Sequence, residues 1–96
     1  MTTSAQDRPA ALDLSREEAW VVHAALLEAI ERAVDADEDP NPAPGLLERV
    51  EAGEEDFDSA ELDYIVDSLR AYRGIAPTRD QHYISHVLDH IEAAQV

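Results

Sequence analysis

The sequence contains no cysteine and no lysine, and only three of its 96 residues are glycine. Without cysteine the chain has no disulfide bond, no thiolate metal site and no thiol nucleophile. No apolar run approaches the roughly 20 residues that cross a bilayer, and Met1–Ala11 lacks the apolar stretch of a secretory signal. We therefore expect a soluble cytoplasmic protein that makes no use of a membrane.

The missing lysine accompanies a large excess of acidic residues. There are 22 Asp and Glu residues against seven Arg, so the formal net charge is −15, although 45% of the residues are hydrophobic. A chain this rich in apolar residues does not have the composition of a disordered one. Surface carboxylates repel one another in dilute buffer, but near 1 M salt the Debye length falls to about 3 Å and screens them. The composition therefore indicates a halophilic protein.

Hydrophobic periodicity predicts an all-α fold, a compact helical bundle of three main helices plus one short helix. The main helices are expected from Ser15 to about Asp35, from Asp58 to Gly74 and from Thr78 to about Ala94, with the short helix at Leu46–Ala52. We expect residues 1–13 to form a flexible N-terminal tail and residues 14–96 to form a single helical-bundle domain.

Start and stop signals support these boundaries. Ser15 with Glu18 and Asp58 with Glu61 have the spacing of capping boxes, in which each side chain satisfies a free backbone N–H of the other residue. Thr78 with Gln81 is a third capping pair by the same spacing. Gly53 is placed to end the short helix in the left-handed conformation.

Each main helix is expected to bury one apolar stripe. In the first helix the stripe consists of Trp20, His23, Leu26, Leu27, Ile30 and Val34, with His23 at its centre and Val21 on the polar side. A histidine at that place is interpreted as a buried or interfacial imidazole with a hydrogen-bond partner. The stripes of the later helices are Leu62, Ile65, Val66, Leu69 and Tyr72, and then Ile84, Val87, Leu88 and Ile91.

His82, His86 and His90 recur every four residues, so they line one side of the last helix, away from its apolar stripe. We expect this row to face solvent or a partner. Three imidazoles also suit zinc, copper or nickel, which makes metal binding by His82, His86 and His90 an alternative. The row lacks the Glu that directly follows the first His in zinc proteases. We expect no cofactor and no enzymatic activity.

The charge is unevenly distributed along the chain. Residues 1–67 hold 19 acidic residues and four Arg, whereas residues 68–96 hold three of each and are formally neutral. A neutral surface on an acidic protein is where another macromolecule approaches with least repulsion. The partner-binding residues expected there are Arg70, Arg73, Arg79, His82, Tyr83, His86 and His90. They predict a non-catalytic protein–protein interaction or regulatory module, in which a second copy forming a homodimer is one candidate partner.

The same region supports an alternative function as a small DNA-associated regulator. A helix-turn-helix would place Arg79, Gln81 and His82 at the start of the recognition helix. DNA affinity depends on basic groups that neutralise phosphates, and three Arg without any Lys supply few of them. Protein is therefore the expected partner, ahead of nucleic acid.

The stretch Leu14–His23, the helix start Asp58–Leu62 and the pair Tyr72–Arg73 before a Pro-containing turn resemble a family of small acidic proteins from halophilic archaea. That family carries a domain of unknown function, and the resemblance covers roughly residues 12–94. It implies an all-helical fold and a salt-rich cytoplasm. It supplies no catalytic or binding residues that can be transferred to this chain.

The acidic composition generates a first prediction. Because salt screens the repulsion among carboxylates, helix content measured by circular dichroism should rise cooperatively as KCl is increased from dilute buffer to molar concentration. Full and cooperative folding in low-salt buffer would contradict the halophilic interpretation.

Overall fold

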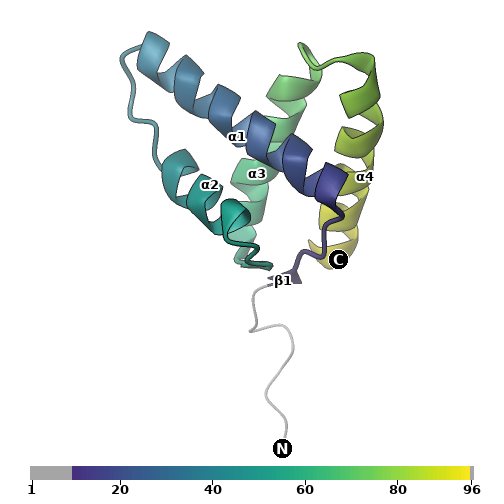
Figure 1. Ribbon diagram of the computed structural model, residues 1–96. Helices are drawn as coiled ribbons and strands as arrows, with labels where there is room; N and C mark the ends of the chain where they lie inside the picture. Colours follow the sequence, from purple (N-terminus) through teal and green to yellow (C-terminus); the bar gives the residue numbers. More distant parts are fainter. Residues whose placement is uncertain (1–9, 96) are drawn as a thin grey trace, which may run out of the picture.

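Four helices make up most of the computed structural model, which describes residues 10–95 (Figure 1). They are α1 (Arg16–Asp35), α2 (Ala43–Glu51), α3 (Ser59–Arg73) and α4 (Thr78–Gln95). A two-residue strand β1 (Ala10–Ala11) pairs antiparallel with β2 (Asp56–Phe57). The predicted all-α bundle is confirmed. None of the helices in this part of the chain is long and apolar enough to span a bilayer.

Helix α1 occupies the centre of the bundle. It runs diagonally across the view of Figure 1, and it packs against α2, α3 and α4. The side that it buries carries mainly small and medium-sized side chains, and its members are Glu18, Val21, Val22, Ala25, Leu26 and Ala29. Alanine at two of these positions lets neighbouring helices approach closely, so all three can pack against this side of α1.

The buried side of α1 differs from the predicted stripe. Val21, predicted to be polar-facing, is fully buried, whereas Trp20, Leu27 and Val34 are 60%, 41% and 62% exposed. Apolar residues cover most of the circumference of α1, so the largest side chains do not by themselves identify the buried side. Because α1 contacts three helices, the side with small side chains, which allows close packing, is the one that is buried. Trp20, Leu27 and Val34 of the predicted stripe are therefore left in solvent.

The faces of α3 and α4 agree with their predicted stripes. Their core residues are Leu62, Ile65 and Leu69 from α3 and Ile84, Val87 and Ile91 from α4. Val66, Tyr72 and Leu88 lie half-buried at the edges of the same core. These two helices have narrower apolar stripes than α1, which is why the sequence identifies their orientation.

Two of the predicted caps are confirmed. Ser15 Oγ accepts the N–H of Glu18 at 3.1 Å, and Glu18 Oε1 accepts the N–H of Ser15 at 2.8 Å. Asp58 and Glu61 form the same reciprocal pair at the start of α3. Gly53 follows α2 with a φ of 79°, in the left-handed region that glycine tolerates.

The predicted pairing of Thr78 with Gln81 is wrong. Thr78 is already the first residue of α4, and the side chain of Gln81 reaches back to the preceding turn. There Gln81 Nε2 donates to the carbonyls of Arg73 at 2.6 Å and Ala76 at 3.1 Å. An amide side chain therefore satisfies carbonyl groups left free at the end of α3.

Part of the predicted tail takes part in the packed structure. The expected tail reached Asp13, but β1 pairs with β2, and the N–H of Leu12 donates to the carbonyl of Glu55 at 2.7 Å. The Leu12 side chain is buried in the core. The rest of the predicted tail, residues 1–9, lies outside the described residues. Helix α2 likewise begins at Ala43, before the predicted Leu46.

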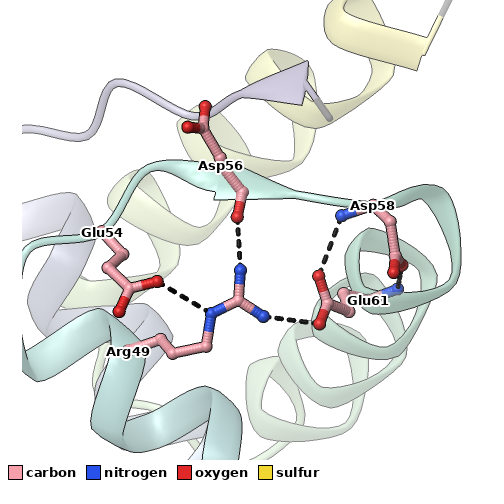
Figure 2. A network of polar contacts seen from close by, with 5 residues as sticks. All are labelled: Arg49, Glu54, Asp56, Asp58 and Glu61. Carbon is pink, nitrogen blue, oxygen red and sulfur yellow. Dashed lines mark hydrogen bonds and ion pairs between the residues drawn. The ribbon is translucent and has the colours of Figure 1, made fainter. Parts of the chain in front are cut away.

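Arg49 joins α2 to the start of α3 (Figure 2). Its Nε donates to Glu54 at 3.0 Å, and its two terminal nitrogens donate to Glu61 and to the carbonyl of Asp56. The guanidinium also lies over the ring of Phe57, 4.7 Å from its centroid. The hydrogen bond to Glu54, followed by that to Glu61, raises the pKa of Arg49 above its ordinary value. One side chain thus holds the α2–α3 connection in place.

Candidate functional site

The residues predicted to bind a partner lie mainly on the surface. Arg70, Arg73, Arg79, His82, His86 and His90 are exposed, and Tyr83 is half-buried. None of the three arginines has a carboxylate within 4.0 Å among residues 10–95. Their roles in binding protein or DNA remain predictions.

The histidine row faces away from the core, as predicted, but it is not isolated. The rings of His82 and His86 have centroids 4.4 Å apart. His86 Nδ1 and His90 Nδ1 lie 3.9 and 4.0 Å from Glu18 Oε2, whose residue is only 6% exposed. Because Glu18 also caps α1, protonated imidazoles here would form ion pairs that link α4 to the start of α1. No group of three or more potential ligands in the described part of the chain is placed to hold a metal ion.

Two of the predicted residues, Arg79 and Tyr83, line an open pocket between the first turns of α1 and α4. The pocket has a volume of about 470 Å³, within the range of small-molecule sites. Its other lining residues are Arg16, Glu17, Trp20 and Asp80. Arg70 and Arg73 do not line it, so only one of the three predicted arginines belongs to this pocket.

The charged groups of this pocket do not neutralise one another. Arg16, Glu17 and Arg79 have no oppositely charged partner within 4.0 Å among the described residues. Asp80 is 6% exposed and accepts a hydrogen bond from the hydroxyl of Tyr72 at 2.9 Å. Burial first, then this hydrogen bond and the charges of Asp80 and Glu28, raises the pKa of Tyr72 above its ordinary value.

Trp20 belongs both to the pocket and to the outer side of α1. Its ring stacks on the imidazole of His23, with centroids 5.6 Å apart and planes 10° apart. His23 Nε2 in turn lies 2.9 Å from Glu51 Oε2 on α2. The interfacial histidine with a hydrogen-bond partner is therefore confirmed, and it supports one face of the indole.

An exposed apolar stripe runs along α1 from this pocket. Trp20, Leu27 and Val34 are separated by seven residues each, and half-buried His23 and Ile30 lie between them. We call these five positions the α1 stripe. The sequence contains a sign of this surface, because a seven-residue apolar repeat is typical of a helix that packs along another helix. The sequence alone predicts this repeat to lie in the core of the domain, whereas Trp20, Leu27 and Val34 are exposed in the structure.

Comparison with known proteins identifies a family but no activity. A family model described as a family of unknown function, DUF7853, matches residues 12–92. No curated protein and no solved structure matches the chain. The matched region contains both the α1 stripe and the pocket.

The buried pair Tyr72–Asp80 generates a second prediction. Tyr72→Phe leaves the Asp80 carboxylate without its donor, and at pH 7 it should lower the free energy of unfolding by about 1–2 kcal/mol. Because the pKa of Tyr72 is raised in the folded state, folding favours the neutral hydroxyl. This stabilisation is complete below about pH 10, the ordinary pKa of tyrosine, and it is lost as the pH rises through the pKa of Tyr72 in the folded protein. Urea unfolding should therefore show a difference between wild type and variant that shrinks above about pH 10.

The matched control is Tyr64→Phe on the same helix, since the Tyr64 hydroxyl has no hydrogen-bond partner among residues 10–95. It should change stability less than Tyr72→Phe at pH 7. The role of the Tyr72–Asp80 hydrogen bond would be contradicted if the two variants lower the free energy of unfolding equally. It would also be contradicted if the difference between wild type and Tyr72→Phe stays constant above about pH 10.

Proposed function

The chain belongs to DUF7853, a family of unknown function, and we propose that it is a non-catalytic interaction module that binds a basic amphipathic helix of a partner protein. The observation that supports this most directly is the exposure of Trp20, Leu27 and Val34 on one side of α1. Tryptophan in particular is enriched where proteins bind one another. The proposed setting is a salt-rich cytoplasm.

The geometry of the α1 stripe favours a helix as the occupant. Its five positions alternate by three and four residues, the spacing that accepts side chains from a helix packed at a shallow angle. From Trp20 to Val34 the stripe is roughly 21 Å long at 1.5 Å per residue. A partner helix of about four turns covers it completely.

Charge favours a basic partner. The exposed carboxylates of Glu17, Glu31 and Asp35 flank the stripe on its solvent side. An amphipathic helix with Lys or Arg beside its apolar face pairs with these groups, and the attraction raises its association rate. In concentrated salt the charge contribution weakens, and burial of the apolar stripe supplies most of the affinity.

A second copy of this chain fits the same surface less well. Self-association along α1 would bring the flanking carboxylates of two protomers together, and each protomer carries a formal charge of −15. Like charges across an interface weaken association, most strongly at low ionic strength, where they are not screened. The homodimer is therefore an outcome that the experiment has to distinguish.

The test uses a synthetic peptide of about five helical turns, with leucine on one face and lysine on the other. Fluorescence of Trp20, the one tryptophan in the chain, reports binding. The peptide should bind saturably, and Leu27→Gln or Val34→Gln should weaken binding at least about tenfold, or about 1.4 kcal/mol. A peptide with glutamate in place of lysine should bind more weakly at the lowest KCl concentration at which circular dichroism shows the chain fully folded, with a smaller difference in molar KCl.

Ile75→Gln is the matched control variant, because Ile75 is 64% exposed, close to the 62% of Val34, but lies outside the α1 stripe. It should bind the peptide like the wild type. The proposal would be overturned if no peptide binds saturably to the folded chain, or if the acidic peptide binds equally well at the lowest KCl concentration that keeps the chain folded. It would also be overturned if Ile75→Gln weakens binding as much as the stripe variants do. So would light scattering that finds a dimer disrupted by Leu27→Gln, since the stripe would then serve a second copy.

A further inference from the structure

The pocket between α1 and α4 contains three kinds of recognition group. Arg16 and Arg79 supply guanidinium groups, Glu17 supplies a carboxylate, and Trp20 and Tyr83 supply aromatic rings. Guanidinium groups bind carboxylates through paired hydrogen bonds. Carboxylates and aromatic faces both attract ammonium groups. The lining can therefore hold either sign of charge.

The opposite charges in this pocket remain apart. No ion pair within 4.0 Å joins the arginines to Glu17 or Asp80 among the described residues, although all four line the same space. Asp80 is already bonded to the Tyr72 hydroxyl, which leaves Glu17 as the carboxylate open to a ligand. Arg16, Arg79 and Glu17 are all exposed and can contact a molecule that enters from solvent.

Trp20 is supported in a way that suits a cation. The imidazole of His23 covers one face of the indole, and the residue is still 60% exposed. His82 meets the ring of Tyr83 edge-on, with centroids 5.6 Å apart. Each ring thus contacts a neighbouring histidine, and within residues 10–95 neither Arg16 nor Arg79 stacks on Trp20 or Tyr83.

We propose that this pocket binds a small zwitterion, with its carboxylate at Arg16 and Arg79 and its ammonium group at Glu17 and the rings of Trp20 and Tyr83. Of the groups open to a ligand, Arg16 and Arg79 are positive and Glu17 is negative, so a ligand with both signs can use all three. The net charge of −15 repels a simple anion, whereas a zwitterion has no net charge to be repelled. A volume of about 470 Å³ is ample for such a molecule.

The test titrates the isotope-labelled full chain with N,N,N-trimethylglycine at constant ionic strength and follows the indole N–H resonance of Trp20. The shift should saturate. Tetramethylammonium chloride and sodium acetate, which each carry half of the zwitterion, should bind at least about fivefold more weakly, because each uses only part of the lining. Sucrose, a solute excluded from protein surfaces, separates binding from a general solvent effect.

Arg79→Gln and Glu17→Gln should each weaken binding of trimethylglycine by about fivefold or more, since each removes one charge contact. Arg73→Gln, an exposed arginine outside the pocket, should have no effect. The proposal would be overturned if sucrose reproduces the shift of the Trp20 indole resonance, or if tetramethylammonium or acetate alone binds as tightly as trimethylglycine. It would also be overturned if Arg79→Gln binds trimethylglycine as the wild type does. Leu27→Gln should bind trimethylglycine like the wild type, although it should weaken binding of the helical peptide. The zwitterion experiment can therefore fail or succeed independently of the peptide experiment.

Discussion

The structure depends on how α1 is enclosed by the other three helices. Val21, Val22, Ala25, Leu26 and Ala29 turn toward the core, and burial of a Val or Leu side chain contributes about 1.5–3 kcal/mol. The two alanines add little apolar area, but they allow the close packing that brings α2, α3 and α4 onto one helix. The consequence appears on the opposite side, where the largest apolar residues of α1 remain in solvent.

Local signals in the sequence were sufficient for much of the fold. The capping boxes at Ser15 and Asp58, the glycine after α2 and the apolar stripes of α3 and α4 each depend on residues close together in the chain. The orientation of α1 depends on three distant helices, so its periodicity alone predicts a stripe of which Leu26 is buried but Trp20, Leu27 and Val34 are exposed. The strand pairing of Ala10–Ala11 and the contacts of Arg49 likewise join segments that only the tertiary structure brings together.

The candidate site was predictable only in part. Arg79 and Tyr83 stood out because residues 68–96 are formally neutral, but their neighbours in the pocket come from the other end of the chain. Trp20 belongs to the apolar stripe that the sequence predicts to be buried, but it is 60% exposed. In the structure it joins the α1 stripe to the pocket, so two proposed binding surfaces share one residue. His86 and His90 of α4 lie 3.9 and 4.0 Å from the carboxylate of Glu18, which caps α1.

The domain folds with the outer side of α1 in solvent, where Trp20, Leu27 and Val34 are exposed. Trp20 reports on that side without labelling, because it is the one tryptophan in the sequence. Collisional quenching of its fluorescence by acrylamide, measured on dilute and folded monomer, tests the claim most directly. We expect acrylamide to quench Trp20 readily, close to the quenching of an exposed indole, and we expect a red-shifted emission. A blue-shifted emission that acrylamide barely quenches would place Trp20 in the core and contradict the account.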